Sequence, residues 1–156
     1  TEEKIIKEIG FGVPPEKYLV KAPPEVQQIA AVARQTPDWV TDTMQAVGQG
    51  AIDPDNENQA QAKLMAYRAA EMDARRKLAE RIDGLMITSN TSVRDFVAES
   101  DEIQSSMMTF QAGAYVVDGS QQVSEDGIAQ VTVAIELKPL WNSILFYKKK
   151  LNLPLE

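Results

Sequence analysis

The segment that most constrains the fold is a long alanine-rich stretch in the middle of the chain, 57–82. Its apolar residues recur at steps of three and four and so share one side of a helix: Ala60, Leu64, Tyr67, Ala70, Ala74, Leu78 and Ile82. Asn56 and Gln59 are spaced as in a capping box, and Gly84 is typical of a left-handed helix end. The sequence therefore predicts one helix of about seven turns.

Charged residues of opposite sign occur four positions apart on the other side of this helix: Glu71 with Arg75, Asp73 with Lys77, and Arg76 with Glu80. Such pairs stabilise a helix by roughly 0.2–0.5 kcal/mol each and indicate a face in water. Asp73 also borders the alanine stripe. It is either an exposed partner of Lys77 or an acceptor of hydrogen bonds from neighbouring groups.

A strand is predicted on each side of the helix. Before it, 39–52 reads as a strand that contains Gly48 and Gly50, and small residues there would let the helix approach closely. After it, 85–93 alternates apolar and polar residues in the pattern of a half-buried strand. The next segment, 95–104, is interpreted as a bend or short helix.

The last third of the chain predicts a long antiparallel hairpin followed by a helix. Strand-like residues extend over 106–123, the turn 125–127 contains Gly127, and 129–137 alternates again. Pro139 then opens a helix.

These elements predict an α+β fold, a two-layer sandwich in which the long alanine-rich helix lies across one face of an antiparallel sheet. We expect this domain over 39–156. The preceding 1–38 contains two Pro-Pro pairs and predicts an extended arm, with room for one short helix at 25–34.

Composition restricts the chemistry. The chain has no His and no Cys, which excludes Ser-His-Asp and Cys-His nucleophiles and metal sites built from imidazole or thiolate. The net charge of −7 argues against binding nucleic acid. We therefore expect no catalytic, cofactor-binding or metal-binding residue, although carboxylate or lysine chemistry stays open as a third hypothesis.

Membrane association is not expected from these residues themselves. No stretch approaches 18 apolar residues, and 1–10 has no signal-peptide core. A leader removed from a longer chain remains open.

One acidic loop resembles the start of a calcium-binding loop, with oxygen ligands at Asp53, Asp55 and Glu57. The pattern then fails, because position six is Asn58 instead of Gly and position twelve is Leu64 instead of Glu. A turn and helix cap is the favoured interpretation.

The other candidate sites also have a structural interpretation. Arg68, Arg75 and Arg76 with Lys63 could bind phosphate, but acids are interleaved. The lysines 148–150 could meet an anionic membrane, yet they suit a helix C-terminus.

Gly48-Gln49-Gly50 lacks the third glycine of a dinucleotide motif. Met107, Met108 and Phe110 form either core or an interface for a partner.

A family resemblance adds an expectation about function. The AVGQGA strand, the helix NQAQAKLMAYRAAEMDARRKLAERIDG and the LMITSNTSVRD that follows resemble the twenty-kilodalton Lpp-type lipoproteins of bacterial envelopes. They also resemble the N-terminal domain of flagellar assembly protein T. The family's helix pattern, A-x-x-D-A-x-x-x-L-x-x-x-I, is matched by Ala70, Asp73, Ala74, Leu78 and Ile82, and the resemblance covers about 39–137.

The resemblance implies a non-enzymatic domain of the cell envelope, on the periplasmic side or at the outer membrane, with a structural or protein-binding role. A lipid anchor would have to lie upstream of Thr1, because the chain has no Cys. The partner would be an envelope protein or a second copy, bound through the sheet surface or a free strand edge. The alternative is a small-molecule-binding module with a pocket lined by Tyr67, Met65 and hairpin residues.

Overall fold

A computed structural model describes residues 36–152 of the chain. In chain order the elements are the 3-10 helix η2 (Asp38–Thr41), β1 (Thr43–Ala51), α2 (Gln59–Asp83), α3 (Val93–Val97), α4 (Asp101–Gln111), β2 (Tyr115–Val116), β3 (Gln122–Val123), β4 (Ile128–Glu136) and α5 (Lys138–Leu151). The predicted arm lies outside the described residues apart from 36–38, and so does the helix expected at 25–34.

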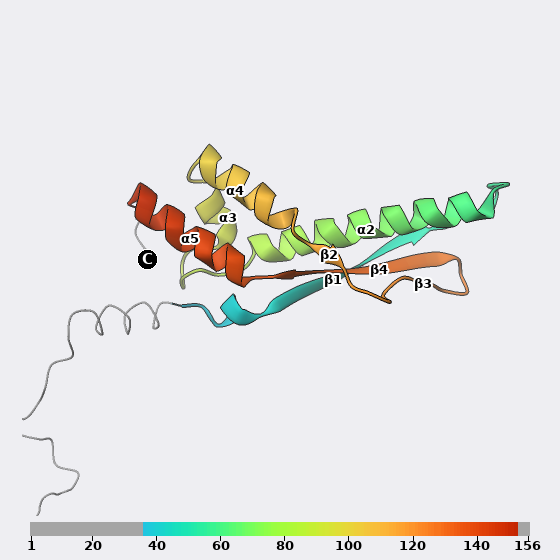
Figure 1. The fold of residues 1–156 in the computed structure, drawn as a ribbon, viewed down its shortest axis with the longest axis horizontal. Helices are drawn as coiled ribbons and strands as arrows, with labels where there is room; N and C mark the ends of the chain where they lie inside the picture. The colour runs from blue at the N-terminus through green and yellow to red at the C-terminus, as the bar shows by residue number, and fades with distance from the viewer. Residues whose placement is uncertain (1–35, 153–156) are drawn as a thin grey trace, which may run out of the picture. The chain divides into compact units, whose positions relative to one another are not determined.

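The sheet is antiparallel, and β4 is its central strand. β1 pairs with β4 along its whole length, from Thr43 opposite Glu136 to Ala51 opposite Ile128. On the other side of β4, the two-residue strands β2 and β3 pair with it one after the other. The helix α2 lies along one face of this sheet (Figure 1). The α+β two-layer sandwich predicted from the sequence is therefore confirmed.

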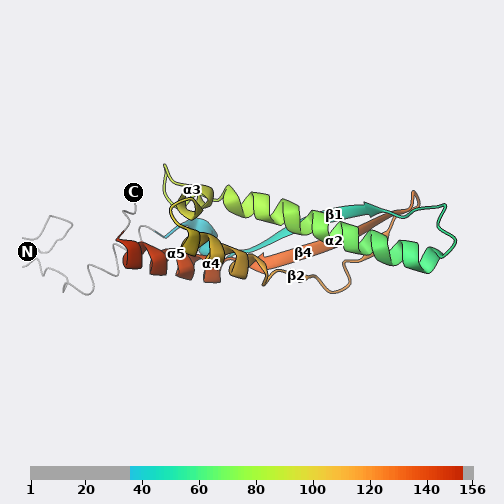
Figure 2. The same ribbon diagram turned by 90° about the horizontal axis from the view of Figure 1, so that it is seen from above.

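The three shorter helices gather at one end of the sheet, beyond the C-terminal end of α2 (Figure 2). There α5 packs against α4 and η2. The rings of Trp39 and Trp141 meet edge to face, with centroids 6.0 Å apart, and the Trp39 Nε1 donates a hydrogen bond to the Met86 carbonyl at 2.9 Å. The hydrophobic core thus continues from the helix–sheet interface into this helical end.

The buried side of α2 follows a strict four-residue step: Ala62, Ala66, Ala70, Ala74, Leu78 and Ile82. The predicted stripe was right from Ala70 onward and wrong before it, since Ala60 and Leu64 are exposed and Tyr67 is only half-buried. Four residues advance about 400° around a helix, so this row turns slowly as the helix follows the twisted sheet. The sequence placed alanines on the inner side correctly from Ala70 onward, but before it the larger Leu64 and Tyr67 were chosen where Ala62 and Ala66 face the strands.

Both predicted ends of α2 need correction in detail. The N-cap is Asn58, whose side chain accepts a hydrogen bond from the Gln61 N–H, whereas Gln59 donates its amide to the Asn56 carbonyl. The helix does end before Gly84, but that glycine has φ −85° and is not left-handed. Three-residue spacing alone did not identify which asparagine caps the helix.

Two predicted strands are wrong. The segment 85–93 forms only one isolated bridge, between Met86 and Ser92, and then enters α3. The segment predicted as strand from residue 106 belongs to α4 as far as Gln111. Ser92 and Ser100 cap α3 and α4 with their side chains, and the buried Ile103 and Met107 lie four residues apart, so these local signals favour helices.

The turn, the last strand and the last helix predicted for the C-terminal third of the chain are confirmed. The turn Ser124–Gly127 closes a short hairpin from β3 to β4, with Gly127 at φ +76°, and β4 lies within one residue of the predicted strand. α5 begins at Lys138 with a proline in its first turn. No helix within 36–152 is long and apolar enough to cross a membrane.

Candidate functional site

The contact between α2 and β1 is unusually close, because two glycines of the strand lie against the helix backbone. A Cβ at Gly48 would lie 1.9 Å from the Ala70 carbonyl oxygen, and one at Gly50 would lie 2.2 Å from the Ala66 carbonyl oxygen. Neither position could hold a side chain without moving the helix. The predicted packing role of both glycines is thus confirmed.

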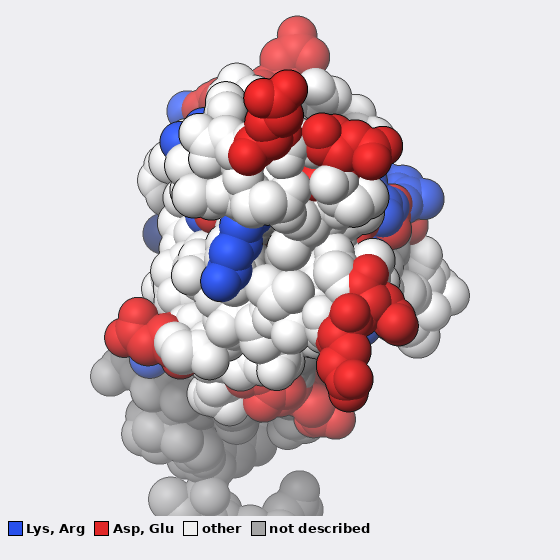
Figure 3. All heavy atoms as spheres, turned by 90° about the vertical axis from the view of Figure 1, so that its right-hand side faces the viewer, with Lys and Arg blue, Asp and Glu red and all other residues white. Residues whose placement is uncertain are grey.

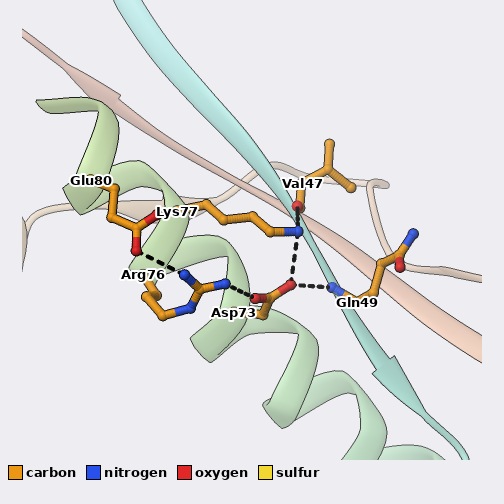
Figure 4. A network of polar contacts seen from close by, with 6 residues as sticks. All are labelled: Val47, Gln49, Asp73, Arg76, Lys77 and Glu80. Atoms are coloured by element: carbon orange, nitrogen blue, oxygen red, sulfur yellow. Dashed lines mark hydrogen bonds and ion pairs between the residues drawn. The ribbon is translucent and has the colours of Figure 1, made fainter. Parts of the chain in front are cut away.

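Because α2 lies so close to β1, polar side chains of the helix reach the free edge of that strand. Asp73 accepts a hydrogen bond from the Gln49 N–H at 3.0 Å, Lys77 donates to the Val47 carbonyl at 3.3 Å, and Arg81 donates to the Gln45 carbonyl. The first two of these contacts are drawn in Figure 4. Steps of four residues along the helix, about 6 Å, match steps of two along the strand, about 6.8 Å. We call these three side chains the edge ladder.

Asp73 is the most connected member of the ladder. Its carboxylate also forms ion pairs with Lys77 and with Arg76, which reaches on to Glu80 (Figure 4). The Gln49 N–H, with Lys77 and Arg76 beside it, lowers the pKa of Asp73 to about 2. Both roles proposed for Asp73 are therefore filled by one side chain, and all three predicted ion pairs of the helix are confirmed.

The opposite edge of the sheet is interrupted. Between β2 and β3, the Ser120 hydroxyl accepts a hydrogen bond from the Thr132 N–H and donates one to the Thr132 carbonyl. The Ser120 side chain here forms the hydrogen bonds that the backbone of a paired strand residue would form. Only short pieces of backbone therefore lie at this edge. Short or covered edges oppose strand addition, so binding through a strand edge is less favoured than the sequence suggested.

A pocket lined by Tyr67, Met65 and hairpin residues was expected between the helix and the sheet. Two open hollows flank the connection from α4 to β2, and neither is lined by Tyr67 or by Met65, which is 56% exposed. One, about 260 Å³, is lined by Arg75, Leu78, Ala79, Ile82, Gln111, Ala112, Ala114 and Ile135. The other, about 430 Å³, is lined by Thr109, Phe110, Gly113, Tyr115, Ile135, Glu136 and Pro139.

The side of α2 that faces away from the sheet exposes large apolar side chains. Its residues follow the buried row two positions out of step, about 200° around the helix: Leu64, Arg68, Met72, Arg76 and Glu80. We call this row the outer face of α2. Leu64 is 50% exposed and Met72 is 72% exposed. Arg68 forms no ion pair with another described residue, whereas Arg76 and Glu80 pair with each other.

The acidic loop before α2 forms a turn and a cap, as the sequence favoured. The Asp53 carboxylate accepts from the Asp55 N–H, and the Asn56 side chain accepts from the Asn58 N–H, each at 2.9 Å. Among residues 36–152 no cluster of acidic side chains is arranged to hold a metal ion. Acidic side chains nevertheless dominate this end of the domain (Figure 3), which also carries the exposed Glu125 and Asp126.

Most of the basic side chains considered as candidate sites contact other groups within the domain. Arg75 pairs with Glu71 at 2.9 Å, and Lys63 lies over the Tyr67 ring at 6.0 Å. At the end of α5, Lys150 pairs with Glu102, which raises the pKa of the lysine. The three predicted lysines thus do not all face solvent as one charged group.

Met107 and Met108 were predicted to lie in a strand, but both belong to the helix α4 and lie on different sides of it. Met107 is buried in the core, Phe110 is half-buried, and Met108 is 71% exposed on the outside of α4. The residues that sequence reasoning missed are Arg81, Met72 and Ser120. A step of four from Asp73 and Lys77 could have identified Arg81.

Comparison with known proteins gives no relative: no protein-family model, no curated protein and no solved structure matches the chain.

Proposed function

We propose that this chain is a non-enzymatic domain of the bacterial cell envelope with a structural or protein-binding role. The observation that supports this proposal is that one set of α2 side chains holds the helix on the sheet and another set faces water. The side chains of the edge ladder are used to hold the helix on β1. The outer face keeps Leu64 and Met72 in water, and we place the contact with a protein partner there because burying these two side chains on association would be favourable.

The envelope location rests on the resemblance to the Lpp-type lipoproteins. The motif behind that resemblance has a physical explanation here: small residues at Gly48, Gly50, Ala70 and Ala74 allow the approach, and Asp73 bonds the strand edge. The proposal extends this likeness to location and role, with a flagellar assembly component as the variant suggested by the second resemblance.

The test is to express the complete gene product, with whatever precedes Thr1, in a bacterial host. The mass of the mature N-terminus and the cell fraction that holds the protein are measured. We expect an envelope protein, acylated if a lipid anchor precedes this chain. A protein that remains in the cytoplasm, unmodified, would refute the envelope proposal.

A small-molecule-binding module is the second candidate, favoured by the hollow of about 430 Å³ beside Phe110 and Tyr115. Its volume falls within the usual range of ligand pockets, about 300–1,000 Å³. Titration with an apolar fluorescent probe tests it. Saturable binding that Tyr115→Ala abolishes and Met72→Glu leaves unchanged would favour this candidate over protein binding.

A further inference from the structure

The outer face of α2 is self-complementary in charge about Ala74. Arg68 lies six residues before Ala74, and Glu80 lies six residues after it. When two copies of a helix pack antiparallel about a two-fold axis at the level of Ala74, each residue faces the one equally far beyond the axis in the partner. Arg68 of each copy then faces Glu80 of the other.

The apolar residues of the same face fit this arrangement. Met72 and Arg76 lie two residues on either side of Ala74, so Met72 of one copy would pack along the aliphatic stem of Arg76 in the other. Met72 is the most exposed large apolar side chain among the described residues. Burying it twice in one contact stabilises association through the hydrophobic effect.

The ion pair between Arg76 and Glu80 within each copy does not prevent a new pair between Arg68 and Glu80 across the contact. Arg68 has no ion pair with a described residue, and the Glu80 carboxylate is 61% exposed while it contacts Arg76. A carboxylate can accept from two cationic groups at once. The contact would therefore add a partner for Arg68 without breaking the network around Asp73.

We propose that the outer face of α2 binds a second copy of this chain, in an antiparallel dimer whose two-fold axis crosses the outer face between Met72 and Arg76, at the level of the buried Ala74. This inference rests on the proposed function and names the partner and the surface. A contact confined to one helix face is smaller than the roughly 800 Å² per partner of a stable complex. The dimer is therefore expected to be weak, with a Kd of about 1–100 μM.

Sedimentation equilibrium of the 156-residue chain, from about 5 to 500 μM, measures this constant. Met72→Lys is expected to weaken dimerisation at least about tenfold, because it places a like charge opposite Arg76 of the other copy. Met108→Lys is the matched control: Met108 is 71% exposed, against 72% for Met72, but lies on α4. It should leave the constant unchanged. A chain that stays monomeric throughout, or equal effects of both variants, would overturn the proposal.

A charge exchange tests the register. Arg68→Glu and Glu80→Arg are each expected to weaken the dimer at least about fivefold, since like charges then face each other. The double variant should return to within about threefold of the unmodified chain. Loss of dimer in the double variant as severe as in either single one would refute the antiparallel register, and circular dichroism of each variant separates this result from unfolding.

Cross-linking gives an independent readout, because the chain has no cysteine of its own. The two residues 72 would lie about 6 Å apart along the helix axes, so a short bis-maleimide reagent should join two copies of Met72→Cys much faster than two copies of Met108→Cys. Equal rates would contradict the dimer. A monomeric chain that is still found in the envelope would refute this inference and leave the proposed function standing, whereas a dimer found in the cytoplasm would do the reverse.

Discussion

At the scale of single residues, the absence of a side chain at Gly48 determines how near α2 can lie to the sheet. We expect Gly48→Ala to lower the free energy of unfolding by about 3 kcal/mol or more, because the new Cβ would overlap backbone atoms that cannot rotate away. Chemical denaturation measures this change.

Gly84→Ala is the control for that substitution. A Cβ at Gly84 would meet its nearest atom at 3.6 Å, and the φ of −85° suits any residue. We expect it to be neutral or stabilising by up to about 1 kcal/mol, through the unfolded state. Similar losses for both variants would show that the glycine contact is not what matters.

The second residue-scale prediction concerns Asp73 and pH. Its pKa is lowered from 3.8 to about 2 by the Gln49 N–H, Lys77 and Arg76. A lowered pKa in the folded state means that the carboxylate contributes stability that is fully present above pH 4 and is lost as the pH falls towards 2.

Asp73→Asn should therefore cost about 1 kcal/mol at neutral pH, since the ion pairs are partly exposed. The cost should shrink as the pH falls from 4 to 2, because the carboxylate of the unmodified chain is protonated there. Thermal unfolding of both proteins across this range measures it. A difference that does not change with pH would contradict the role given to the ionised carboxylate.

Residue identity predicted part of this site and missed the rest. The pairing of Asp73 with Lys77 could be inferred because it depends on spacing within one helix, and the packing of Gly48 could be inferred because a glycine within a strand indicates a close approach of other backbone. The hydrogen bonds from the Gln49 N–H to Asp73 and from Arg81 to the Gln45 carbonyl join residues 24 and 36 positions apart. Such contacts depend on how two elements are placed, which spacing within one element does not contain.

At the scale of elements, the edge ladder protects β1 from pairing with another strand. We expect Lys77→Ala combined with Arg81→Ala to increase the rate of aggregation several-fold, because the Val47 and Gln45 carbonyls at the strand edge lose their partners. Light scattering at elevated temperature measures this rate.

Lys63→Ala combined with Arg94→Ala removes the same positive charge from positions that do not bond β1. Aggregation that rises equally in this control would assign the effect to net charge and contradict the ladder's protective role.

The element scale also shows why helix prediction succeeded for α2 and reached only the first turn of α4, within the segment 95–104 interpreted as a bend or short helix. The periodic signal of the long helix extends over about seven turns, and its buried side contains five successive steps of four residues. α4 has eleven residues, and its Met107, Met108 and Phe110 suit a strand as well as a helix when read alone. The decisive signal was the Ser100 cap, which a reading based on hydrophobic alternation passed over.

At the scale of the whole molecule, the two-layer fold leaves α2 with one side against the sheet and the other in water. The small residues of the inner side make the close contact, and the large residues Leu64 and Met72 are left outside. These two exposed apolar side chains on the longest helix are the observation on which the proposal of protein binding rests.

The measurement that tests this claim most directly is photo-cross-linking in bacteria that express the complete gene product. A photoreactive amino acid is placed at position 72 or, as a control, at position 108, and adducts are sought in each cell fraction. We predict a protein adduct from position 72, in the envelope fraction, at a yield well above that from position 108. No adduct from position 72, or equal adducts from both positions, would contradict the account.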